Sequence, residues 1–92
     1  MTQVQSQESN KAVRNEIRAF IEENFLYMRP DLDLQDDDDL LGLGVIDSLG
    51  FVELVEEIQS RYGIQVSDVE ITEDNFGSVS AIVAFVEGKR SA

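Results

Sequence analysis

Three stretches of this chain repeat their apolar residues at the spacing of an α-helix, and this repetition limits the folds open to it. The first begins near Asn10 and is limited by Pro30, whose ring excludes the helical conformation for the preceding residue. The second covers residues 48–62 and the third residues 78–88. Their apolar stripes consist of Val13, Ile17, Phe20, Ile21 and Phe25, of Leu54, Ile58 and Tyr62 with Phe51 or Val55, and of Val79, Ile82, Val83 and Val86. With a short helical turn around residues 71–76, the pattern predicts an all-α four-helix bundle of three longer helices and one short helix.

Residues that commonly cap helices mark the ends of these segments. Asp47 is a suitable N-cap for the second helix, and Gly63 stands where a left-handed glycine ends one. Ser78 is expected to cap the last helix and Gly88 to end it. The alternating residues 64–66 are too few to form a sheet, so we expect an extended loop there.

A long connection, residues 31–47, joins the first two long helices. In compact domains, loops beyond about 12–15 residues are usually functional or hold structure of their own. Apolar side chains scattered through this loop predict that it is ordered against the core. It also contains the consecutive aspartates Asp36–Asp39. An EF-hand calcium loop starting at Asp37 would fail at Leu41 and at Ser48, so we predict no metal site. The role of the aspartate run stays open, and a solvated loop is the favoured interpretation.

The charge is strongly negative and unevenly placed. The chain has 7 basic and 19 acidic residues, a net charge of −12 at pH 7. Residues 31–74 contain Arg61 as their only basic side chain. Such a field repels phosphate backbones and anionic lipids, so we expect no nucleic-acid or membrane partner. The acidic surface either keeps the protein soluble or steers basic protein partners toward it, and both interpretations stay open at this point.

The composition excludes most enzyme chemistry. The chain has no cysteine and no histidine. Thiolate nucleophiles, Cys- or His-ligated metals and a serine–histidine pair are therefore excluded. A nucleophile elbow has the pattern G-x-S-x-G, and around Ser48 only the second glycine is present.

At 92 residues the chain is long enough for one small domain. We place the folded domain at residues 9–88, a disordered N-terminal tail at 1–8 and a C-terminal tail at 89–92. The N-terminus is polar and lacks the apolar segment of a signal peptide. No stretch approaches the ~20 apolar residues of a membrane helix. We therefore expect a cytoplasmic protein, and its charge and small core favour a monomer.

Ser48 directly follows the long loop and opens the second helix. Taken alone, a serine at a helix start is an ordinary cap. Its surroundings read Gly44-Val45-Ile46-Asp47-Ser48-Leu49, followed by Val52-Glu53-Leu54. This stretch resembles the phosphopantetheine attachment signature of acyl and peptidyl carrier proteins, roughly G-x-x-D-S-L-x-x-V-E-L. The resemblance extends over residues 11–88.

The resemblance implies a carrier protein and not an enzyme. A separate phosphopantetheinyl transferase, using coenzyme A and magnesium, would attach 4′-phosphopantetheine to Ser48 through a phosphodiester. Asp47 and Leu49 would flank this attachment site as cofactor-binding residues. The terminal thiol of the arm would carry an acyl or aminoacyl group as a thioester. The transferase would supply the catalytic groups, in keeping with the absence of histidine.

The resemblance also implies contacts with the transferase and with enzymes that load and process the acyl or aminoacyl group. Leu49 and Val52 are expected to form an apolar docking spot. Glu53, Glu56 and Glu57 are expected to contact basic patches on these partners. Each glutamate is equally well explained as part of a solvated helix face, and both interpretations stay open here.

The identity of the cargo is not determined by the sequence. Fatty-acid carriers commonly read D-L-G-A-D-S-L, whereas this chain has Leu43-Gly44-Val45-Ile46 before the aspartate. That form resembles stand-alone carriers of specialised pathways, among them polyketide, nonribosomal-peptide and aminoacyl carriers such as prolyl or D-alanyl ones. Gly50 lowers helix stability relative to alanine and is expected to loosen the attachment point. The alternative from another class is an unmodified acidic helical adaptor that binds basic protein partners.

Overall fold

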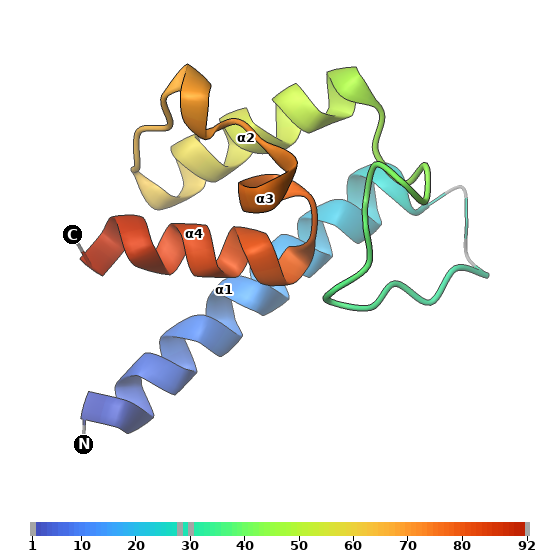
Figure 1. The fold of residues 1–92 in the computed structure, drawn as a ribbon. Helices are drawn as coiled ribbons and strands as arrows, with labels where there is room; N and C mark the ends of the chain where they lie inside the picture. Colours follow the sequence, from blue (N-terminus) through green and yellow to red (C-terminus); the bar gives the residue numbers. More distant parts are fainter. Residues whose placement is uncertain (1, 28, 30, 92) are drawn as a thin grey trace.

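The computed structural model describes the backbone of residues 2–27, 29 and 31–91, and the side chains of residues 11–27, 29 and 31–90. Over these residues it contains four α-helices and one 3₁₀ turn, with no strand, which confirms the predicted all-α fold. The elements are α1 (Thr2–Phe25), α2 (Ser48–Tyr62), η1 (Asp68–Glu70), α3 (Glu73–Phe76) and α4 (Val79–Ser91). In Figure 1, α4 crosses α1, α2 lies above both, and the short α3 sits between α2 and α4.

Two helix ends differ from the sequence-based expectation. The first helix begins at Thr2, about two turns before Asn10, so residues 2–8 continue it in place of the predicted tail. It ends at Phe25, and Pro30 lies outside the described residues. The last helix continues through Gly88 to Ser91, so the expected C-terminal tail is helical up to that residue. The apolar repeat marks only the part of a helix that packs, and polar residues can extend the helix beyond it.

The two glycines predicted to end helices behave differently for a conformational reason. Gly63 has φ 63°, in the left-handed region, and its N–H donates to the carbonyl of Gln59. This confirms it as the residue that ends α2. Among the described glycines, only Gly44 and Gly63 have positive φ, so Gly88 stays in the helical conformation and does not end α4.

The hydrophobic core is built by the helices together with the long loop. Leu34, Leu40, Val45 and Ile46 of the loop are buried alongside the helical stripes. The N–H of Leu40 donates to the carbonyl of Gly77 at 2.8 Å, and its own carbonyl accepts from the N–H groups of Val45 and Ile46. These contacts confirm that the loop is ordered, and they tie it to the start of α4.

The first aspartate of the acidic run connects three elements. The carboxylate of Asp36 lies 3.0 Å from Nη1 of Arg14 and 2.8 Å from Nη1 of Arg18, both on α1. Its backbone carbonyl accepts from the N–H of Ser80 on α4 at 2.9 Å. Burial alone would raise the pKa of Asp36, but the hydrogen bonds and charges of Arg18 and Arg14 outweigh it and hold the pKa below its usual value.

Two further aspartates of the run close turns in the loop. The Asp38 carboxylate accepts from the N–H of Gln35 at 2.8 Å, and the Asp39 carboxylate accepts from the N–H of Gly42 at 3.0 Å. Side-chain bonds of this kind are the usual reason for aspartate in turns. The run remains at least partly exposed, as expected for a solvated loop, and Asp36, Asp38 and Asp39 in addition hold the loop in shape.

Candidate functional site

The serine singled out by the sequence is the first residue of α2, and it is exposed. The preceding Asp47 has the extended conformation of an N-cap, and its Oδ1 accepts from the N–H of Gly50 at 2.7 Å. This confirms Asp47 as the cap. Within the described part of the chain, the Ser48 hydroxyl takes part in no hydrogen bond. It is thus left free at a helix end whose first-turn N–H groups have no partner inside the helix.

The start of α2 is held in place by close packing. Gly50 is buried, and an ideal Cβ built on it would lie 2.8 Å from Cε1 of Phe25 at the end of α1. Val45 and Ile46 are buried just before the helix. The glycine therefore allows α1 and α2 to approach closely, and the expectation that Gly50 loosens the attachment point was wrong.

The part of the loop that leads to Ser48 is also held in a defined conformation. Gly44 has φ 73°, a left-handed conformation that favours glycine. The Arg29 guanidinium donates to the carbonyl of Leu43 at 3.0 Å, which joins the segment after α1 to the same part of the loop.

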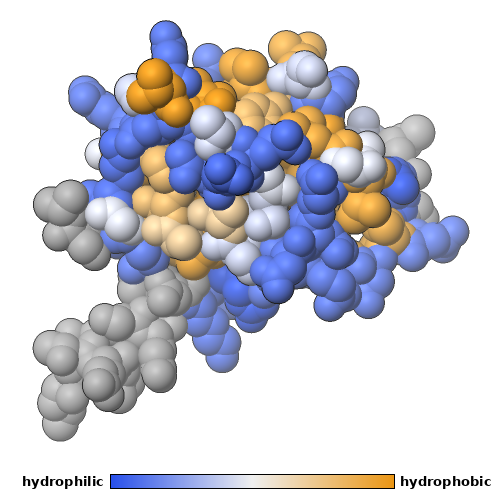
Figure 2. Space-filling view, in the orientation of Figure 1, coloured by the Kyte–Doolittle hydropathy of each residue, from blue (hydrophilic) through white to orange (hydrophobic). Residues whose placement is uncertain are grey.

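The predicted apolar docking residues do reach the surface. Leu49 is 71% exposed and Val52 is 49% exposed. In Figure 2 the face is largely hydrophilic, and apolar residues gather along its upper edge, where α2 and η1 lie. Such residues are available for contact with another protein, and their role in docking stays a prediction.

The three glutamates proposed as partner contacts are not equivalent. Glu53 and Glu56 are exposed. Glu57 binds Arg61 one turn later, at 2.7 Å from Nη2 and 3.0 Å from Nε. The hydrogen bonds that Arg61 donates to Glu57 raise the pKa of Arg61 above its usual value. Glu57 is therefore already engaged within α2, and Glu53 and Glu56 are the better candidates for partner contact.

A shallow cavity of about 330 Å³ lies next to the start of α2. Asp47, Leu49 and Gly50, which flank Ser48 in the chain, form part of its wall. The wall also includes Asn24 at the end of α1 and Tyr27 in the turn after it. Sequence reasoning missed these two residues, because their proximity to Asp47 and Leu49 depends on how the end of α1 packs against the start of α2.

Aromatic rings pack together in the core of the bundle. The ring of Phe76 packs against Phe51 at 6.3 Å and against Phe85 at 4.8 Å between centroids, filling the space between α2, α3 and α4. Leu54 and Ile58 of α2 are fully buried behind these rings. Phe51 and Phe85 are partly buried and pack against this core.

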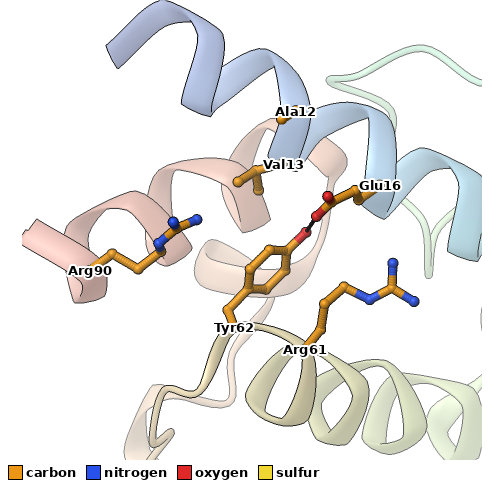
Figure 3. Close-up of a pocket in the computed structure, with 6 residues that line it drawn as sticks. All are labelled: Ala12, Val13, Glu16, Arg61, Tyr62 and Arg90. Carbon is orange, nitrogen blue, oxygen red and sulfur yellow. Dashed lines mark hydrogen bonds between the residues drawn. The ribbon is translucent and has the colours of Figure 1, made fainter. Parts of the chain in front are cut away.

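A second cavity, of about 480 Å³, lies at the other end of α2 (Figure 3). Across it the hydroxyl of Tyr62 donates to Oε1 of Glu16 at 2.7 Å, and Arg90 lies 5.8 Å above the Tyr62 ring. Burial, together with the bond to Glu16, raises the pKa of Tyr62 well above its usual value. This contact joins the end of α2 to α1 and is structural.

Two further properties of the described residues bear on function. They include no cluster of three or more acidic side chains arranged to hold a metal ion. None of the described helices combines the length and apolar character needed to cross a membrane.

Comparison with known proteins relates the site to a family. The phosphopantetheine attachment site family matches residues 15–86, a range that includes Ser48 and the whole of α2. D-alanyl carrier proteins from three strains of Streptococcus thermophilus are each 38% identical to this chain over 80 residues. The aligned region covers 87% of this chain and 98% of each relative.

Proposed function

This chain belongs to the phosphopantetheine-binding carrier proteins, and we propose that it carries an aminoacyl group on an arm attached to Ser48. As a member of this family it is a carrier and not an enzyme. Its cofactor is covalently attached 4′-phosphopantetheine, whose terminal thiol holds the cargo as a thioester.

The assignment of Ser48 rests on one observation: Asp47, and not Ser48, accepts the hydrogen bond that caps α2. Two other serines at helix starts use their own hydroxyls locally: Ser67 donates to Glu70 at 3.2 Å, and Ser78 accepts from the N–H of Ala81 at 3.1 Å. At α2 the aspartate caps the helix instead, which leaves the Ser48 hydroxyl exposed and free to be modified.

The surroundings of Ser48 fit a phosphate. Ser48 opens a helix of 15 residues, whose first-turn N–H groups and dipole favour an anion at that end. The nearest carboxylate, that of Asp47, is bonded to the N–H of Gly50. The residues present can therefore hold the phosphodiester, with Ser48 as the covalent link and α2 as its electrostatic support.

Two observations support an aminoacyl cargo. The first is the similarity to D-alanyl carrier proteins over nearly their full length. The second is the core packed with Phe51, Phe76 and Phe85, which favours a small cargo held outside the bundle over a long acyl chain held within it. The sequence also has no cysteine, so the thiol of the arm is the only one on the molecule.

Carriers of this family work with a transferase and with loading and processing enzymes. For this chain we place the contact surface on the exposed part of α2 that follows Ser48. Leu49 and Val52 supply its apolar part, and Glu53 and Glu56 supply its charge. Charge of this kind raises the rate of encounter with basic partners.

The test is the intact mass of the protein after incubation with coenzyme A, magnesium and a broad-specificity phosphopantetheinyl transferase. Ser48→Ala is compared with Ser60→Ala, which removes another exposed serine of α2. We expect one phosphopantetheine on the wild type and on Ser60→Ala, and none on Ser48→Ala. Modification of Ser48→Ala would overturn the assignment of the site. No modification of the folded wild type, beside a control carrier that is modified, would favour the unmodified adaptor.

The cargo is tested on the modified protein with amino-acid-activating enzymes and, separately, with acyl-loading enzymes. Loading of D-alanine or another amino acid is the expected result. Loading by acyl-transferring enzymes alone would overturn the aminoacyl assignment while leaving the carrier function intact.

A further inference from the structure

The cavity beside Ser48 is formed by segments that are distant in the sequence. Asn24 comes from the end of α1, Tyr27 from the turn that follows it, Val45 from the loop, and Leu49 and Glu53 from α2. Its volume of about 330 Å³ lies at the lower end of the range of ligand sites. Ser48 itself is not part of the wall, but its chain neighbours Asp47 and Leu49 are, so a group attached to that serine starts close to the cavity.

We propose that this cavity is the resting site of the neutral, pantetheine part of the arm, with Asn24 and Tyr27 as its contact residues. The inference rests on the proposed attachment at Ser48. It adds a binding site on α1 to a function otherwise assigned to α2 and the loop before it.

The chemistry of the wall suits that part of the arm, which carries methyl groups and two amides. Leu49 and Val45 provide apolar surface. Tyr27 is 69% exposed and presents a large ring at the cavity. The Nδ2 of Asn24 donates to the carbonyl of Phe20 at 2.8 Å. This bond fixes the side-chain amide and leaves its oxygen available to accept from an amide N–H of the arm.

The charges around the cavity favour the uncharged part of the arm over the phosphate inside it. The phosphate is favoured at the N-terminal end of α2, where the helix dipole is positive. The wall of the cavity includes the carboxylate of Glu53, which disfavours a second anion there. The uncharged part of the arm can therefore occupy the cavity while the phosphate stays at the helix end.

The experiment compares the unmodified and modified full-length protein by nuclear magnetic resonance. The probes are the side-chain amide of Asn24 and the ring of Tyr27, because neither is next to Ser48 in the chain. Isotope-labelled coenzyme A makes the amide protons of the arm visible, so that their contacts with the Tyr27 ring can be measured directly. Ser48→Glu supplies a negative charge without an arm and shows how much of any shift comes from charge alone.

We expect modification to shift the Asn24 and Tyr27 signals beyond the shifts seen in Ser48→Glu. We also expect contacts between the arm amides and the Tyr27 ring. The single substitutions Tyr27→Ala and Asn24→Ala each remove one contact residue from the wall, and each should increase the mobility of the arm. Val69→Ala is the matched control, because Val69 is 84% exposed and is not part of the wall. It should leave the arm unchanged.

A confirmed gain in mass at Ser48 with unchanged Asn24 and Tyr27 signals would overturn the proposed resting site. Contacts of the arm only with Val52 and Glu56, which are not part of the wall, would do the same. If no mass is gained at Ser48, the proposed function fails instead, so the two failures are told apart by the mass spectrum.

Discussion

Gly50 of α2 and Phe25 of α1 lie so close that a methyl group on the glycine would reach within 2.8 Å of the Phe25 ring. The same methyl would lie 3.1 Å from Cγ2 of Ile46 and 3.2 Å from Oδ1 of Asp47. This contact between the end of α1 and the start of α2 is therefore built around a residue without a side chain, two positions after the proposed attachment serine.

Replacement of Gly50 by alanine should destabilise the protein. Alanine gains about 1 kcal/mol in helix propensity. Overpacking costs about 1–3 kcal/mol, and three close contacts favour the upper part of that range. We expect a net loss of about 1 kcal/mol in the free energy of unfolding, measured by urea denaturation.

Gly88→Ala is the matched control for that substitution. Gly88 also lies inside a helix, but a Cβ there would meet nothing within 4 Å. Alanine should therefore stabilise the protein, by up to about 1 kcal/mol. Equal effects of the two substitutions would contradict the packing argument.

Asp36→Asn should destabilise the protein at neutral pH by about 1 kcal/mol, after allowance for solvent screening of its partly exposed ion pairs. The lowered pKa of Asp36 means that its contribution is present above the unfolded pKa of about 4 and is lost as the pH falls through the folded value. The difference in unfolding free energy between wild type and variant should therefore shrink on acidification. A constant difference from pH 7 to pH 2 would show that the ion pairs with Arg14 and Arg18 are not responsible.

Loss of the α2 cap can be separated from loss of its charge. Asp47→Ala removes the acceptor for the N–H of Gly50 and should cost about 1 kcal/mol. Asp47→Asn keeps a capping oxygen and should be close to wild type in stability. The rate of modification at Ser48 is then measured in both variants. A rate lowered in both would indicate a role for the charge, and a rate lowered only in Asp47→Ala would indicate a role for the cap.

Charge reversal at the exposed glutamates of α2 should weaken encounter with basic partner enzymes. We expect Glu53→Lys with Glu56→Lys to lower kcat/KM for the transferase, with the difference shrinking as salt is added. Each single variant, Glu53→Lys or Glu56→Lys, is compared with Glu23→Lys, which makes the same change of charge at an exposed glutamate on α1. Should the α1 variant lose as much activity, net charge and not the α2 surface would explain the effect.

Tyr62→Phe removes the hydroxyl that donates to Glu16 and should lower the free energy of unfolding by about 1 kcal/mol. Thermal unfolding followed by circular dichroism measures this. Because the contact lies at the end of α2 remote from Ser48, modification of Ser48 should proceed at the wild-type rate. A slowed modification would show that the two ends of α2 are coupled.

Much of the site could be predicted because its determinants are local. Asp47 caps α2 through a bond to a residue only three positions away, and Gly63 ends the helix through its own φ. The boundaries of α2 follow from these short-range interactions, so the sequence located them correctly. The start of α1 and the end of α4 were missed, because a helix can continue past its packed face without any apolar residue to mark it.

The sequence by itself determined the all-helical class, the acidic surface and the position of Ser48 at the start of a capped helix, because periodicity, charge and capping act between near neighbours. Only the tertiary structure decided what the aspartate run and Gly50 do. Asp36 meets Arg14 and Arg18 across 22 and 18 positions of the chain, and Gly50 meets Phe25 across the gap between two helices. The cavity joining Asn24 and Tyr27 to Ser48 likewise exists only because α1 and α2 pack together, which no local pattern specifies.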